Sequence, residues 1–184
     1  MPKLIRNRRL TADSWLLLDR EPERWLAPGE DGLVPDFPAA ADLIVPLRLW
    51  RLRRDDLLDR PGRSGVWLAP DEDPAALAGD LDRLALVAVT FPKFSDGRGF
   101  SSARVLRERY GYAGELRAIG DVLRDQLLFL ARCGFDAFAL RDDQDAEAAL
   151  AAFDDFSEAY QGSASQPLPL FRRRLAAGAA ASTS

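Results

Sequence analysis

The apolar residues between positions 43 and 160 follow two alternating patterns. Short, continuous apolar runs bounded by glycine, proline or charged residues are typical of buried β-strands. Four such runs are present, at residues 65–69, 84–91, 115–119 and 135–140. Elsewhere, apolar residues recur every three or four positions, which is typical of amphipathic helices. These stretches cover residues 46–58, 73–81, 101–110, 121–133 and 145–160. Strands that alternate with helices predict parallel βαβ units with right-handed crossovers.

We therefore expect an α/β domain at residues 41–160, with about four parallel βα units in an open sheet or a half-barrel-like arc. Four units are too few to close an eight-stranded barrel alone. Residues 1–40 are interrupted by proline and glycine, so we expect an irregular N-terminal segment with at most one short strand, at Leu16–Leu18. Residues 161–184 are rich in alanine, serine and glycine, which predicts a mobile, flexible C-terminal tail.

The expected helix ends carry residues that suit them. Asp73 and Asp121 precede predicted helices and are expected to be N-caps, because a carboxylate accepts hydrogen bonds from free backbone N–H groups. Gly111 and Gly134 follow the last apolar positions of two helices and are expected to end them. Ser101 opens another predicted helix, where an N-cap is the simplest role.

The composition removes several kinds of chemistry. The chain has no histidine and one cysteine, Cys133. Ser–His, Cys–His and histidine–metal mechanisms, an intrachain disulfide, a CxxC redox pair and a thiolate-held iron–sulfur cluster are therefore excluded. Cys133 lies on the apolar stripe of residues 121–133, so we expect a buried core thiol. We expect no metal site and no haem, iron–sulfur or zinc ligands. The cofactor stays unknown, because a flavin in an unconventional site is compatible with the sequence.

The charge balance narrows the class of partner. The formal net charge is −4 and the pI is near 5.0, so we do not expect a nucleic-acid-binding protein. No apolar stretch resembles a signal peptide or a membrane span, and we expect a cytoplasmic protein without a membrane partner. Of the 25 basic residues only Lys3 and Lys93 are lysines, which is typical of a GC-rich bacterial genome.

A candidate anion site follows the most apolar predicted strand. In a parallel sheet, ligands bind beyond the carboxyl ends of the strands, and the loop at residues 91–101 combines two glycines, two cations, a carboxylate and, at the predicted helix start, a hydroxyl. Backbone N–H groups at a helix start bind anions. The candidate ligand-binding residues, which include two from the next strand and loop, are Lys93, Asp96, Arg98, Ser101, Arg117 and Asp121. Without histidine, Asp96 or Asp121 is the plausible general base. The loop at residues 140–143, after the last predicted strand, is a further candidate position for a ligand site.

The same residues also have a simpler interpretation, in which their roles are structural. Residues 93–117 hold six basic and three acidic residues, but Arg104, Arg107 and Arg109 are also what the solvated face of a helix carries. Asp96-Gly97 is also a turn sequence. The loop matches neither a P-loop nor a GxGxxG fingerprint. The catalytic residues therefore stay unknown.

Four stretches carry a family resemblance: FPKFSDGRGFS from Phe91, LRERYG from Leu106, GELRAIGDVL from Gly114 and RCGFDAF from Arg132. Across roughly residues 40–160 the chain resembles the bacterial domain-of-unknown-function family 934, often labelled as an oxidoreductase of sulfite reduction. The resemblance implies a role in assimilatory sulfur metabolism, since members tend to be encoded beside sirohaem-containing sulfite reductase. It implies no catalytic residues.

Two hypotheses follow, and the sequence leaves both open. In the first, the protein is an accessory protein of assimilatory sulfite reduction that binds sulfite reductase or its electron donor and has no redox centre of its own. In the second, it is an α/β oxidoreductase, or an anion-binding enzyme or sensor. Its pocket would then take a small anionic ligand: a sulfur oxyanion, a sulfonucleotide or a flavin phosphate.

Overall fold

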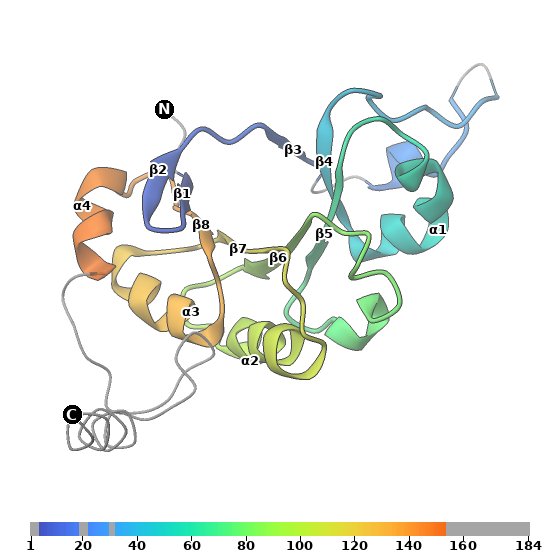
Figure 1. Ribbon diagram of the computed structural model, residues 1–184. Coiled ribbons are helices and arrows are strands. Elements are labelled where there is room, and N and C mark those ends of the chain that lie inside the picture. Colours follow the sequence, from blue (N-terminus) through green and yellow to red (C-terminus); the bar gives the residue numbers. More distant parts are fainter. Residues whose placement is uncertain (1–3, 19–21, 30–31, 154–184) are drawn as a thin grey trace, which may run out of the picture.

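The computed structural model describes residues 4–18, 22–29 and 32–153 and contains one mixed sheet in that part of the chain (Figure 1). The strand order is β2-β1-β8-β7-β6-β5-β4-β3. The strands are β1 (Leu4–Arg6), β2 (Arg9–Thr11), β3 (Trp15–Leu17), β4 (Asp42–Pro46), β5 (Ser64–Leu68), β6 (Leu86–Phe91), β7 (Glu115–Gly120) and β8 (Ala137–Ala139). From β3 to β8, neighbouring strands are parallel and follow one another in chain order.

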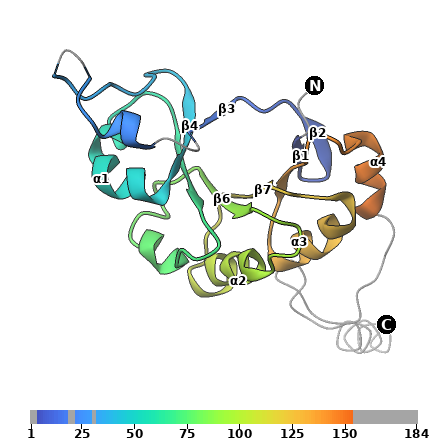
Figure 2. The ribbon, with the colours of Figure 1, turned by 180° about the vertical axis from the view of Figure 1, so that it is seen from behind.

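Helices and turns connect these strands along the outside of the arc (Figures 1 and 2). The α-helices are α1 (Leu47–Leu58), α2 (Arg98–Arg104), α3 (Leu127–Cys133) and α4 (Ala146–Leu150). A π-helical turn, η3 (Val105–Arg109), extends α2. The 3₁₀ turns are η1 (Pro22–Trp25), η2 (Pro74–Leu77), η4 (Arg124–Gln126) and η5 (Ala151–Phe153). The predicted α/β architecture with a half-barrel-like arc is confirmed. None of the helices in the described residues is long and apolar enough to span a bilayer.

The two edges of the curled sheet approach each other. The β1–β2 hairpin, which turns at Asn7 and Arg8 with φ of 50° and 60°, adds antiparallel strands beside β8. β2 and β3 are the two outermost strands, yet only residues 12–14 separate them in the chain. Such a linker spans at most about 14 Å, so it crosses the open side of the arc (Figures 1 and 2).

Each side of the sheet carries its own apolar cluster. On β6, Val87 and Val89 point outward into the main core, which the helices cover, while Leu86 and Ala88 point inward. Alternate residues of a strand point to opposite faces, so the continuous apolar run of β6 serves both. The inner cluster also contains Ile44 and Ile119, with Trp15, Trp67 and Ala139 packed against it.

Three strands lie in the segment predicted to be irregular. β3 agrees with the short strand expected at Leu16–Leu18, whereas β1, β2 and also β4 were not predicted. β4 runs directly into α1, with Pro46 as both the last strand residue and the N-cap. The helical pattern that begins there therefore hides the strand. β1 and β2 are three residues long, with one arginine each; β1 pairs with β8, and β2 pairs with β1 alone.

Several predicted helix ends need correction. Asp73 is an N-cap, accepting a hydrogen bond from the backbone of Ala75, but the element it caps is the short turn η2. Ser101 is not a cap, because α2 begins at Arg98 with Gly97 as its N-cap. Asp121 is not a cap either, since α3 begins six residues later and the Asp121 carboxylate has other partners.

The structure also tests two predictions for residues 121–160, on Gly134 and on Phe129. Gly134 ends α3 in the left-handed conformation, as expected. Phe129, which shares the apolar stripe predicted within residues 121–133, is instead exposed. The end of the last predicted helix and the C-terminal tail at 161–184 lie outside the described residues.

Candidate functional site

The loop after β6 and the start of α2 carry four of the predicted site residues, and Arg98 among them is paired with a neighbouring carboxylate. Arg98 forms a two-point ion pair with Asp96, at 2.9 Å (Nε–Oδ1) and 2.7 Å (Nη2–Oδ2). These hydrogen bonds hold the pKa of Asp96 below its usual range. Lys93 and Ser101 are exposed. The guanidinium expected to bind an anion is therefore occupied by a carboxylate two positions away.

Asp121 fastens this loop to the end of the sheet. Its Oδ2 accepts a hydrogen bond from the backbone N–H of Phe94 at 2.8 Å, and its Oδ1 accepts one from Arg141 Nη1 at 2.6 Å. The side-chain amide of Gln126 donates to the carbonyl of Phe94 at 2.8 Å. Both polar groups of the Phe94 backbone are thus held, although its side chain is 58% exposed.

Two further aromatic residues lie on α2, the helix that follows this loop, and on α3, the next helix. Phe129 of α3 is 52% exposed and packs edge-on against Phe100 of α2, with ring centroids 4.8 Å apart. Gln126 connects the Phe94 loop to the start of α3. We call Phe94, Phe100 and Phe129 the aromatic surface.

Arg117 lies on the opposite, inner face of the sheet and is 1% exposed. Its Nε donates to Glu115 Oε1 at 2.7 Å and its Nη1 donates to Asp13 Oδ2 at 2.9 Å. Nη2 is also 2.7 Å from Glu115 Oε1, but it makes no hydrogen bond there. Nη2 is one of the buried side-chain nitrogens that have no hydrogen-bond partner in the described part of the chain.

Arg117 borders a cavity of about 380 Å³ at the carboxyl ends of β3, β4, β7 and β8, here called the inner pocket. Its apolar walls include Trp15, Leu17, Ile44, Ile119 and Leu140. Its charged lining consists of Asp13, Arg117, Arg141 and Asp142.

Ion pairs hold Arg141 at the mouth of the inner pocket. Besides Asp121, Arg141 contacts both oxygens of Asp143, at 2.7 Å each. These hydrogen bonds lower the pKa of Asp143 to about 2. The arrangement is anchored by Gly120, whose φ is +96° and where an added Cβ would lie 2.5 Å from the carbonyl oxygen of Phe91.

The structure therefore divides the six predicted site residues. Lys93, Asp96, Arg98 and Ser101 belong to the outer loop and the start of α2, whereas Arg117 faces the inner pocket. Asp121 connects the two regions through Phe94 and Arg141. Asp13 and Trp15, which line the inner pocket, belong to no periodic apolar pattern in the sequence, so the sequence did not indicate them as site residues. Arg141 and Asp142 lie in the loop already recognised after the last strand.

Arg107 is not on a solvated helix face. Its Nε donates to Gly134 O at 3.0 Å, Nη1 to Gly114 O at 2.8 Å and Nη2 to Asp136 Oδ2 at 2.7 Å. Burial raises the pKa of Asp136. Arg107 therefore joins the end of α3 to the start of β7, and with Arg117 also turned inward, the outer surface carries less positive charge than the sequence indicates.

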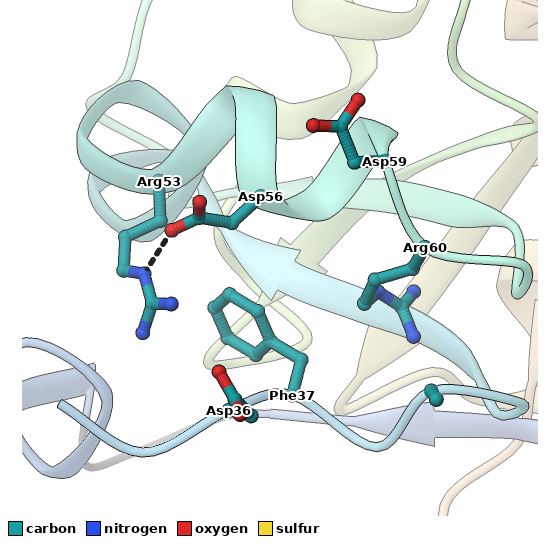
Figure 3. Close-up of a pocket in the computed structure, with 7 residues that line it drawn as sticks. Asp36, Phe37, Arg53, Asp56, Asp59 and Arg60 are labelled. Carbon is teal, nitrogen blue, oxygen red and sulfur yellow. Dashed lines mark hydrogen bonds and ion pairs between the residues drawn. The ribbon is translucent and has the colours of Figure 1, made fainter. Parts of the chain in front are cut away.

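A second cavity, of about 350 Å³, lies between α1 and the N-terminal segment (Figure 3). Arg53 stacks over the Phe37 ring at 4.6 Å and donates to Asp56 and to the carbonyls of Trp25 and Pro35. Arg60 donates to the carbonyl of Ala41 at 2.9 Å. These arginines fasten the N-terminal segment to α1, which is a structural role.

Comparison with known proteins gives a family and no curated relative. No curated protein matches the chain. The family model described as "Bacterial protein of unknown function (DUF934)" matches residues 65–171, more than half of the chain. The matched region begins at β5 and includes the aromatic surface, Arg117 and Arg141, whereas Asp13 and Trp15 precede it. The chain therefore belongs to this bacterial family of unknown function, DUF934.

Proposed function

We propose that this protein is an accessory protein of assimilatory sulfite reduction in the cytoplasm, where it binds sulfite reductase or its electron donor through the aromatic surface and has no redox centre of its own. The sulfur context comes from the sequence resemblance. The observation that carries the binding role is Phe94, an exposed aromatic side chain on a backbone held from both sides.

Such an arrangement suits a protein–protein contact. Aromatic residues are enriched among the few side chains that supply most of the binding energy of an interface. A residue whose backbone is already fixed loses less conformational entropy on binding. The exposed cation of Lys93 is next to Phe94 in the chain and favours an acidic patch on the partner.

The state of Cys133 agrees with a role that needs a partner. The thiol is buried, and this burial raises its pKa. The thiolate is the reactive form of cysteine, so the group best suited to redox or nucleophilic chemistry is held in its unreactive form.

The alternative, an anion site at the six predicted residues, has less geometric support. An anion at Arg98 would compete with Asp96, and one at Arg117 would compete with Asp13 and Glu115. Lys93 is the cation of that set for which the described residues provide no ion pair.

The test is binding of the full chain to purified sulfite reductase, and separately to its electron donor, from the same bacterium. We expect Phe94→Ala and Phe129→Ala each to weaken binding about 10- to 30-fold, as for central interface aromatics. Leu52→Ala on α1 is the matched control, because Leu52 is 62% exposed and lies on another helix. Absence of binding to both proteins, or an equal loss in the Leu52 variant, would contradict the proposal.

A further inference from the structure

The turn η4 and the helix α3 form one helical stretch at residues 124–133, because Gln126 and Leu127 at their junction both have right-handed helical backbone angles. On the inner side of α3 the buried residues are Leu127, Leu130 and Cys133. A helix turns about 100° per residue, so four other residues lie within roughly 100° of one another on the outward side. We call them the α3 stripe: Asp125, Leu128, Phe129 and Arg132.

The α3 stripe carries one unpaired charge of each sign. Asp125 is exposed, Arg132 is half-buried, and neither has a hydrogen-bond or ion-pair partner in the part of the chain that the structure describes. The neighbouring helix differs, because Arg104 of α2 is paired with Glu108 at 3.4 Å. The two charges of the stripe are therefore available to a molecule that covers this face.

The order of residues in the stripe is self-complementary. From Asp125 to Arg132 the outward positions read acidic, apolar, apolar and basic, with their midpoint between Leu128 and Phe129. If a second copy of the helix lies antiparallel about this midpoint, each Asp125 faces the other copy's Arg132, and each Leu128 faces the other copy's Phe129. Such reciprocal contacts are what a two-fold dimer interface requires.

The apolar part of the stripe continues into the aromatic surface. Phe129 is 52% exposed and packs edge-on against Phe100, and Phe94 on the adjacent loop is 58% exposed. Contiguous exposed apolar residues mark interaction sites. Aromatic residues at the centre with charged residues at the rim is also the usual composition of a protein–protein interface.

We propose that a second copy of this chain covers the aromatic surface, in a two-fold dimer in which α3 packs antiparallel against α3 and Asp125 of each copy pairs with Arg132 of the other. The dimer hides the surface that the proposed function assigns to sulfite reductase or its electron donor. Competition between self-association and partner binding therefore rests on the proposed function, whereas the dimer itself does not.

Sedimentation equilibrium of the full chain alone tests the dimer. We expect the average mass to rise from that of one 20.3-kDa chain towards twice that value between about 1 and 100 µM, for a Kd on the order of 10 µM. Asp125→Arg and Arg132→Glu are each expected to weaken self-association at least about tenfold, because each brings like charges together twice. An equimolar mixture of the two variants should recover association to within about threefold of wild type, because both contacts of the mixed dimer then join opposite charges.

Asp82→Arg is the matched control, because it changes the charge of another exposed aspartate by the same amount and should leave self-association unchanged. If Arg132→Glu does not unfold cooperatively, the comparison of Asp125→Arg with Asp82→Arg decides the matter. The proposal is overturned if the wild type stays monomeric up to about 200 µM, if Asp125→Arg associates as tightly as Asp82→Arg, or if the mixture of folded variants associates no better than either alone. An intact dimer that binds neither sulfite reductase nor its electron donor would contradict the proposed function alone.

Discussion

Arg107 and Arg117 lie on opposite sides of the sheet with their side chains turned inward, and they differ in how many of their nitrogen atoms donate hydrogen bonds. Arg107, beneath the helices, reaches backbone carbonyls and Asp136 with its Nε, Nη1 and Nη2 atoms. Arg117, on the inner face, is more deeply buried yet leaves Nη2 without a hydrogen-bond partner in the described residues. Arg107 therefore joins distant backbone segments through all three of its nitrogens, whereas Arg117 joins only two carboxylates on the inner face of the sheet.

The largest expected effect is the loss of Arg107. Arg107→Met removes hydrogen bonds to Gly114, Gly134 and Asp136 and leaves a partly buried carboxylate without its cation. We expect a loss of about 3–4 kcal/mol in the free energy of unfolding, measured in urea. Arg117→Met is expected to cost about 1–2 kcal/mol, because Asp13 lies on an exposed linker and can turn to water, and Glu115 keeps its ion pair with Arg6. An equal or larger cost for Arg117→Met would break the comparison.

Gly120→Ala is expected to cost about 3 kcal/mol. Its φ is +96° and its added Cβ would meet the carbonyl oxygen of Phe91 at 2.5 Å, so backbone strain and a steric clash coincide. Gly79→Ala is the matched control, since nothing lies within 4 Å of the Cβ there. If the unfolding curves of the two variants coincide, the end of β7 is not fixed as described.

Asp80 is expected to make stability depend on acid. Hydrogen bonds from Arg54 and from Trp50 Nε1 (2.9 Å) hold the pKa of Asp80 below its ordinary value of 3.8. The unfolded chain therefore takes up the proton first, so the stabilisation is fully present above pH 3.8 and is lost as the pH falls below it. Asp80→Asn should lower the Tm by roughly 4 °C at pH 7. At pH 2.5 the difference should shrink, and a constant difference between the two pH values would refute this role.

The smallest effect is expected from Arg98→Ala. The Arg98–Asp96 pair has good geometry, but the arginine side chain is 60% exposed, and exposed ion pairs contribute little because water and salt screen them. The Tm should match that of wild type within error. A clear decrease would show that Arg98 has a partner besides Asp96, which would revive the outer loop as a site.

The sequence predicted the parts of the fold that depend on local patterns. The run at 84–91 became β6 because a strand covered on both faces needs no polar alternation, and Gly134 ends α3 because glycine adopts positive φ without strain. β4 was missed because Pro46 suited the helix that follows it. Cys133 was correctly predicted to be buried.

The site was harder to predict because it depends on contacts between distant residues. Asp13 meets Arg117 across 104 positions, and Arg141 meets Asp121 across 20. No local spacing indicates either pair. The sequence identified charged residues at strand ends, but whether a cation faces a ligand or a carboxylate is decided by the curl of the sheet.

The most direct test of the distinction between the two arginines is urea unfolding of the Arg107→Met and Arg117→Met variants side by side. We predict the larger loss in the free energy of unfolding for Arg107→Met, because Arg107 makes hydrogen bonds with Nε, Nη1 and Nη2, whereas Nη2 of Arg117 makes none in the described residues. Equal losses for the two variants, or a larger loss for Arg117→Met, would contradict the account.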